Sequence, residues 1–140
     1  MKKIVVGVDG SDTSKQALRW AIDNAGGAEV VALHAYDVPL PVPDATPGHP
    51  LDLAEIVTKT HEGAVQFATS IVDEVVGDHP AVKAEAVEGR PVEVLIEAAA
   101  SADLLVIGSN GAGRAELLLG SVSLECVEQA SGPVLIYRQP

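Results

Sequence analysis

The stretch that decides the fold is Leu104–Ser123, which reads LLVIGSNGAGRAELLLGSVS. Its first residues are apolar and typical of a buried strand, and Gly108 opens a loop that carries two further glycines. A leucine run then ends at Gly120, where Ser121 and Ser123 indicate the start of a helix. Glycine-rich loops let main-chain N–H groups approach an anion closely, and a helix start adds partial positive charge. The order strand, glycine loop and helix start therefore predicts a phosphate-binding site.

Apolar runs rich in β-branched residues predict strands along the rest of the chain. One of them, Val82–Val87, alternates with charged residues and is therefore expected at an edge of the sheet. The expected strands are Lys3–Asp9, Glu29–Tyr36, Val82–Val87, Asp103–Ile107 and Val134–Tyr137.

Helical periodicity fills the gaps between these strands. The expected helices run from a cap at Ser11 to Gly26, over Leu51–Val76, after Pro91, and from Ser121. Their apolar faces are expected to include Leu53, Val57, Phe67, Val122 and Val127. Strands that alternate with helices are typical of an α/β fold, an open and doubly wound parallel sheet covered on both faces. No internal repeat or boundary interrupts the pattern, so residues 1–140 are expected to form one domain.

Ligands of such sheets bind beyond the carboxyl ends of the strands, near the point where the strand order reverses. Asp9, Tyr36 and Gly108 lie at such ends. The proline-rich segment 38–50 cannot be a regular helix or a central strand, and a loop of this length favours a functional flap.

Composition excludes several classes of function. The 140 residues carry a formal net charge of −11, which argues against nucleic acid and anionic membranes as partners. Cys126 is the only cysteine and is expected to be packed, and the four histidines show no ligand spacing, so no metal site is predicted. His34 is expected as a hydrogen-bonded interior residue. The short apolar start resembles no signal peptide, and a cytoplasmic location is expected.

Three segments of the sequence resemble the universal stress protein family. They are IVVGVDGSDTSKQALRWA from Ile4, LHAYDV from Leu33, and GSNGAGRAELLLGSVSLECVEQASGPVLIYR from Gly108. The resemblance implies a five-stranded sheet of order 3-2-1-4-5, a Rossmann-like arrangement. It also implies a homodimer formed through the last strand, Val134–Tyr137, and in many members the binding of ATP.

ATP-binding members carry a glycine, two residues, a second glycine, nine residues, and then Gly-Ser or Gly-Thr. Here the glycines are Gly108 and Gly111, and eight residues separate Gly111 from Gly120-Ser121. The resemblance implies that adenine meets Val8, Asp9 and Ala35, and that Gly108 and Gly111 hold the ribose and phosphates. It places the phosphates at Gly120, Ser121, Val122 and Ser123, with Arg114 as the nearby cation.

The preferred interpretation is a regulatory, nucleotide-binding stress protein that takes ATP, with ADP or AMP as alternatives and Mg²⁺ carried by the phosphates. The shorter spacing and Ala112, in a position often basic in the family, keep open a second interpretation, a dimeric interaction module without nucleotide. A slow ATPase is a third, but there is no GxxxxGK[ST] motif and Asp9 has no visible catalytic partner. No catalytic residue is predicted. Asp9 as a simple cap, and Arg114 as a solvated residue, remain the structural alternatives.

Overall fold

The computed structural model describes residues 1–39, 52–77, 81–109 and 120–139. The expected phosphate ligands Gly111 and Arg114, and most of the proline-rich segment, lie outside these residues. Strands and helices alternate along the described chain. They are β1 (Lys3–Gly7), α1 (Asp12–Asp23), β2 (Glu29–Tyr36), α2 (Leu53–Val76), β3 (Val82–Glu88), α3 (Pro91–Ala100), β4 (Leu104–Gly108), α4 (Ser121–Gln129) and β5 (Val134–Tyr137).

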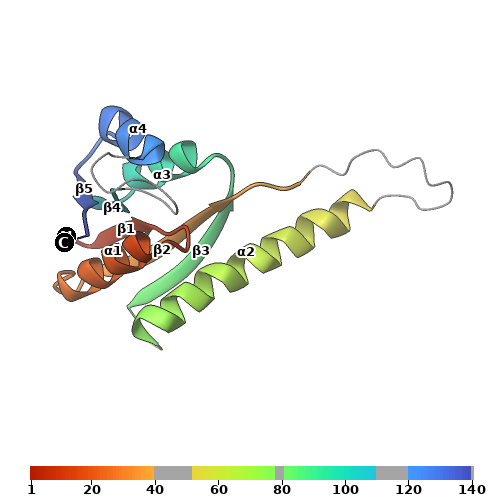
Figure 1. The fold of residues 1–140 in the computed structure, drawn as a ribbon, viewed down its shortest axis with the longest axis horizontal. Helices are drawn as coiled ribbons and strands as arrows, with labels where there is room; N and C mark the ends of the chain where they lie inside the picture. The colour runs from red at the N-terminus through yellow and green to blue at the C-terminus, as the bar shows by residue number, and fades with distance from the viewer. Residues whose placement is uncertain (40–51, 78–80, 110–119, 140) are drawn as a thin grey trace.

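The strands form one five-stranded parallel sheet in the order β3-β2-β1-β4-β5. This confirms the doubly wound α/β fold, the edge position of β3 and the strand order that the family resemblance implied. Helices α1 and α2 cover one face of the sheet, and α3 and α4 cover the other (Figure 1).

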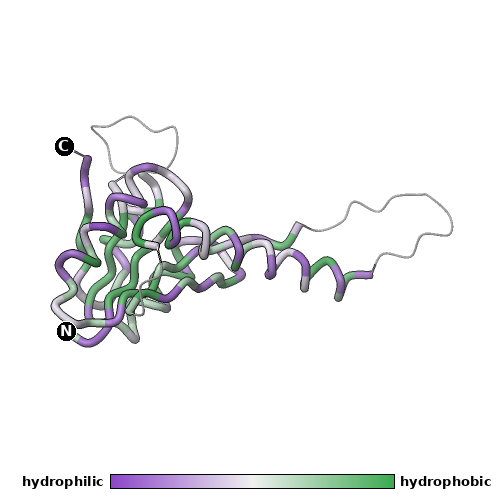
Figure 2. Tube along the Cα trace, turned by 90° about the horizontal axis from the view of Figure 1, so that it is seen from below, coloured by the Kyte–Doolittle hydropathy of each residue, from purple (hydrophilic) through white to green (hydrophobic). Residues whose placement is uncertain are grey.

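Successive residues of the central strands feed two separate cores. Ile4 and Val6 of β1 pack on the α1 and α2 side, whereas Val5 packs on the α3 and α4 side, and all three are at most 1% exposed. Figure 2 shows the apolar segments running through the strands in the middle of the molecule. Continuous apolar runs therefore predict the central strands correctly, because both faces of a parallel sheet are buried.

Four strand ends differ from the prediction, and β3 and β4 each run one residue further than expected, to Glu88 and Gly108. β1 ends at Gly7 and not at Asp9, because Gly10 adopts a φ of 85° and turns the chain toward α1. β4 begins at Leu104 and not at Asp103, because the side chain of Asp103 turns back to bind the start of β1.

The predicted helix starts hold with one shift, whereas α1 ends at Asp23, before the expected Gly26, with Asn24 as its C-cap. The Ser11 side chain accepts a hydrogen bond from the N–H of Ser14 and begins α1 as expected. α2 begins at Leu53, two positions later than expected, because Asp52 is its N-cap and accepts from the N–H of Glu55.

The predicted apolar faces of α2 and α4 are wrong in part. Leu53 and Val57 are 57% and 46% exposed, because the N-terminal half of α2 projects beyond the sheet (Figure 1). Val127 is 48% exposed, because α4 turns Ser123 and Cys126 toward the sheet instead. Periodicity marks the apolar side of a helix, but it does not show how far the neighbouring sheet extends.

The amino ends of β1 and β4 are joined by one carboxylate. Asp103 Oδ2 accepts hydrogen bonds from the N–H groups of Lys2 and Lys3 at 2.7 and 2.9 Å. These main-chain bonds lower the pKa of Asp103, because they stabilise its charged form. A depressed pKa in the folded state means that the carboxylate contributes stability above its unfolded pKa, and that this contribution disappears as the pH falls through the folded value.

We therefore expect Asp103→Asn to lower the midpoint of thermal unfolding at pH 7, since an amide oxygen is a weaker acceptor than a carboxylate. The difference from the parent should shrink as the pH falls below about 4, where the carboxylate of the unfolded parent takes up a proton, and should disappear once the pH passes the lowered pKa of the folded state. Circular dichroism melts at pH 7 and pH 3 measure both. Glu128→Gln, an exposed carboxylate without an ion pair among the described residues, is the control. A difference that stays constant down to pH 3 would contradict this role.

Candidate functional site

The candidate site lies above the carboxyl end of the central strand. β1 ends at Gly7, whereas its neighbours β2 and β4 continue to Tyr36 and Gly108. A cavity of about 300 Å³ occupies the crevice, a size at the lower end of small-ligand sites. Its lining residues are Gly7, Val8, Asp9, Ser11, Ser14, Leu33, His34, Ala35, Pro91, Leu95, Ile107, Gly108, Gly120, Ser121, Val122 and Ser123.

The structure brings the expected ligand residues of the described chain together around this one cavity. The lining includes Val8, Asp9, Ala35, Gly108, Gly120, Ser121, Val122 and Ser123. They come from the ends of β1, β2 and β4 and from the start of α4. Residues distant in sequence meet here because the carboxyl ends of parallel strands share one edge of the sheet.

Sequence reasoning missed the contribution of α3. Pro91 and Leu95 form part of the wall of the cavity. The sequence Gly89-Arg90-Pro91 predicts a turn before a helix, but it does not show where that helix crosses the sheet. In the structure Gly89 has a φ of 145° and Pro91 is the first residue of α3. This turn brings the start of a helix back over the same edge of the sheet.

The main chain of Ala35 faces the crevice. Alternate residues of a parallel strand direct their N–H and C=O groups to opposite neighbours. Val8 N–H donates to the Leu33 oxygen and Gly89 N–H to the Tyr36 oxygen, both at 2.9 Å, so Leu33 faces β1 and Tyr36 faces β3. Ala35 therefore directs its N–H and C=O toward the β1 side, at a level where β1 has ended. The crevice thus presents one donor and one acceptor side by side.

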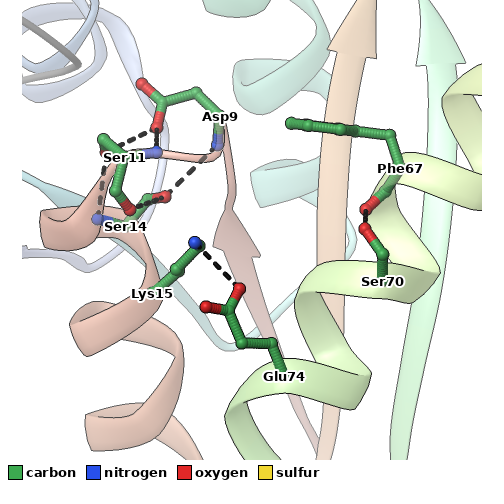
Figure 3. A network of polar contacts seen from close by, with 7 residues as sticks. All are labelled: Asp9, Ser11, Ser14, Lys15, Phe67, Ser70 and Glu74. Atoms are coloured by element: carbon green, nitrogen blue, oxygen red, sulfur yellow. Dashed lines mark hydrogen bonds and ion pairs between the residues drawn. The ribbon is translucent and has the colours of Figure 1, made fainter.

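Asp9 has a structural task as well as a place in the lining. Its Oδ1 accepts hydrogen bonds from the N–H and the hydroxyl of Ser11, at 2.9 and 2.6 Å. The hydroxyl of Ser14 donates to the Ser11 oxygen at 3.0 Å and accepts from the Asp9 N–H at 3.3 Å. Figure 3 shows the second carboxylate oxygen pointing away from both serines. Asp9 is therefore an exposed acceptor held in a fixed position at the mouth of the cavity.

Two hydrogen bonds seat the start of α4 on the end of β4. Gly120 N–H donates to the Ser109 oxygen at 2.7 Å, and the Ser123 hydroxyl donates to the Gly108 oxygen at 2.6 Å. The Gly120 amide and the Ser123 hydroxyl proton are consequently engaged within the protein. These two groups position the start of the helix.

The remaining amides of the first turn of α4 can meet an anion. The first hydrogen bond within the helix runs from Leu124 N–H to the Gly120 oxygen, at 3.0 Å. The N–H groups of Ser121, Val122 and Ser123 precede it, and none of them donates to a carbonyl within a helix. Gly120 offers no side chain to cap them. These amides and the positive end of the helix dipole are therefore the groups in the described lining that suit an anion.

Among the described residues we looked for cationic side chains in the cavity, for a metal site, for a reactive cysteine and for a membrane-spanning helix. The cavity lining contains no Lys or Arg, and no cluster of three His, Cys, Asp or Glu side chains could hold a metal ion within residues 1–39, 52–77, 81–109 and 120–139. Burial raises the pKa of the Cys126 thiol, with Glu125 adding to the effect, so this cysteine is packed as expected. None of the helices described is long and apolar enough to cross a membrane.

Gly108 is required by packing, whatever the cavity binds. A Cβ added there would lie 2.8 Å from Cγ2 of Thr13 and 3.3 Å from its Cβ. The first turn of α1 therefore rests directly on the end of β4. A glycine in this motif is explained by the fold as well as by a ligand.

Comparison with known proteins decides the family. The universal stress protein family model matches residues 1–138. The chain belongs to the universal stress protein family. Universal stress protein Rv2624c of Mycobacterium tuberculosis is 33% identical over 139 residues, which cover 99% of this chain and 48% of that protein. Universal stress protein MJ0531 of Methanocaldococcus jannaschii is 33% identical over 144 residues, which cover 99% of this chain and 83% of that protein. The chain spans about half the length of the mycobacterial relatives it matches.

Solved structures of the family share the fold of this universal stress protein. A universal stress protein in complex with cAMP is 27% identical with a TM-score of 0.65, over 99% of this chain and 98% of that chain. Hypothetical protein MJ0577 is 25% identical with a TM-score of 0.69, over 99% of this chain and 96% of that chain. The sheet order of this universal stress protein is the family's.

We expect Gly108→Ala to destabilise the protein by about 1–3 kcal/mol, the usual cost of an added methyl group in a packed region. Thr13→Ser removes the methyl group that the new Cβ would meet and keeps the hydroxyl. The double variant should therefore recover most of the lost stability, which urea unfolding of all four proteins measures. Equal losses in the single and double variants would show that the contact with Thr13 is not the cause.

Proposed function

We propose that this universal stress protein binds an adenine nucleotide in the crevice above β1 and acts as a cytoplasmic regulatory protein in the stress response. The observation that carries the proposal is the pairing of two groups in one cavity. The main chain of Ala35 suits a base, and the first turn of α4 suits a phosphate. The structural relative in complex with cAMP, an adenine nucleotide, supports the same ligand class.

The crevice favours adenine over guanine. On the edge that carries N7, adenine presents the N6 amino donor beside the N7 acceptor. On the same edge guanine presents two acceptors, O6 and N7. The C=O and N–H of Ala35 complement the adenine pair, and the C=O would repel the O6 atom of guanine. Leu95 and Pro91 supply an apolar wall for the face of the base.

ATP is the nucleotide we propose, with ADP and AMP as alternatives. The α-phosphate would accept hydrogen bonds from the amides of Ser121, Val122 and Ser123. Since the described lining holds no Lys or Arg side chain, Mg²⁺ carried by the phosphates would offset the remaining charge of ATP. The exposed oxygen of Asp9 would then lie at the mouth, where it can accept a hydrogen bond from a ribose hydroxyl.

Binding without efficient hydrolysis fits the described site. The side chains with hydrogen-bonding groups in the described cavity lining are Asp9, Ser11, Ser14, His34 and the serines of α4. Asp9 Oδ1 and the hydroxyl oxygens of Ser11 and Ser14 already accept hydrogen bonds from main-chain N–H groups. A hydrolase would need a residue that orients an attacking water and a cation at the transferred phosphate. A family member that binds no nucleotide and acts as an interaction module is the alternative, and the measurement below separates the two.

We also propose a homodimer through β5. Val134–Tyr137 is an edge strand, and all four residues are only half-buried. The Ser109 N–H donates to the Tyr137 oxygen, so Tyr137 faces β4 and Ile136 directs its N–H and C=O to the open edge. An apolar edge of this kind is complemented by a second copy related by a two-fold axis.

Ser121→Pro tests the phosphate site. Proline is well tolerated at the first position of a helix, and Gly120 already has the extended ψ of 161° that precedes proline readily. The variant loses one amide aimed at the phosphate, so its affinity for ATP and AMP should fall about tenfold, as for a hydrogen bond to a charged group. Titration calorimetry measures this.

Two controls sharpen this experiment. Ser121→Ala keeps the amide and should bind more tightly than Ser121→Pro by the same factor. Adenosine, which has no phosphate, should not distinguish the two variants. Parent protein that gives no heat with ATP or AMP, and releases no nucleotide when denatured, would reject the proposed function in favour of the interaction module.

Ile136→Pro tests the dimer. It removes an outward N–H group while leaving the β4–β5 ladder intact, since that ladder uses the groups of Leu135 and Tyr137. Sedimentation velocity should show a shift from dimer to monomer for this variant, but not for Ile136→Val, which keeps the N–H. A parent that is monomeric at micromolar concentration would contradict the proposed interface.

A further inference from the structure

Phe67 of α2 reaches across to the turn that carries Asp9 and Ser11. Figure 3 shows its side chain extending from the helix toward this turn. Gly10, between the two residues, has a φ of 85°, and a Cβ added there would lie only 2.8 Å from the Phe67 Cζ. The ring therefore packs directly against the main chain of Gly10, in space that only a glycine leaves open.

The same ring supports a second part of the cavity. The centroids of the Phe67 and His34 rings are 4.6 Å apart, with the planes inclined by 51°. His34 Nδ1 is hydrogen-bonded to the Val8 oxygen at 3.1 Å, as expected, but the side chain is only half-buried and not interior, because it lines the cavity. Val8, Asp9, Ser11 and His34 all line the cavity, whereas Phe67 does not. Phe67 thus stands behind the cavity wall and contacts both strand ends that form it.

Phe67 is a poor candidate for a purely structural residue of the core. It is 40% exposed, while Ala64, Ala68 and Ile71 of the same helix are at most 7% exposed and attach α2 to the sheet. The contacts that the structure shows for its ring are with Gly10 and His34, at the edge of the cavity wall. These contacts explain the position of the ring better than burial in the core does.

We infer that Phe67 is a positioning residue for the cavity: it fixes the Asp9–Ser11 turn and His34, and it couples the occupancy of the site to the docking of α2. The role in nucleotide binding rests on the proposed function, but the support of the turn does not. Coupling of this kind is reciprocal, so a ligand that orders the turn also strengthens the contact with α2.

The first experiment uses the protein without nucleotide. Hydrogen exchange, resolved by NMR, compares the parent with Phe67→Ala, Phe67→Tyr and Val57→Ala. Val57 is a matched control, because it is 46% exposed on the same helix and does not line the cavity. We expect Phe67→Ala to speed exchange of the Ser11 and Ser14 amides several-fold, and Phe67→Tyr, which keeps the ring, to restore the parent rates. Unchanged rates in Phe67→Ala, or an equal effect in Val57→Ala, would overturn the inference.

The second experiment adds AMP. We expect Phe67→Ala to lose affinity on the order of five-fold, at the lower end of usual coupling between sites, and Phe67→Tyr to bind as the parent does. In the parent, AMP should also slow exchange around Phe67 in α2, and this effect should vanish in Phe67→Ala while protection at the start of α4 persists. Equal affinity in the parent and Phe67→Ala would overturn the coupling. Absence of AMP binding by the parent would reject the proposed function, and the exchange rates without nucleotide would still decide whether Phe67 supports the turn.

Discussion

The site depends on the early end of the central strand. β1 stops at Gly7 while β2 and β4 on either side run further, so the middle of the sheet edge is left open. The left-handed Gly10 causes this end, because it turns the chain into α1 before a further pair with β2 can form. Without that turn, the ladder would continue past Leu33 and would occupy the main chain of Ala35. The cavity therefore exists because β1 is shorter at this edge than β2 and β4, and the side chains line it.

Around this opening the first turns of α1 and α4 support the ends of the strands, and the first turn of α4 also leaves main-chain N–H groups for a ligand. α1 is held by the serines that bind Asp9, and its first turn rests on Gly108. α4 is seated by Ser123 and Gly120, and these bonds leave its first-turn amides directed at the crevice. The glycines, serines and amides at these strand and helix ends therefore divide into groups that build the site and groups that remain for a ligand. Gly108 belongs to the first group, and the amides of Ser121 and Val122 belong to the second.

Much of this arrangement could be predicted from the chain alone. The β-branched runs predict the strands, because a parallel sheet buries both faces, and the strand-end argument placed Asp9 and Gly108 in one site. Ala35 came from the family resemblance, whereas Tyr36, the third residue assigned to a strand end, faces β3 and is not part of the cavity lining. The contribution of Pro91 and Leu95 could not be derived, since it depends on how α3 crosses the sheet. The exposure of Leu53 and Val57 could not be derived either, because periodicity does not show where the sheet ends. The contact of Phe67 with Gly10 joins residues far apart in sequence, so no local sequence pattern predicts it.

The most direct test of this account is a titration of ¹⁵N-labelled protein with AMP and with GMP, followed by the amide chemical shifts. We expect AMP to change the amide chemical shifts of Ala35, Ser121, Val122 and Ser123 with one common dissociation constant. GMP should change the chemical shift of Ala35 far less. If AMP at millimolar concentration leaves these four amides in place while the spectrum remains that of the folded protein, the crevice above β1 is not a nucleotide site.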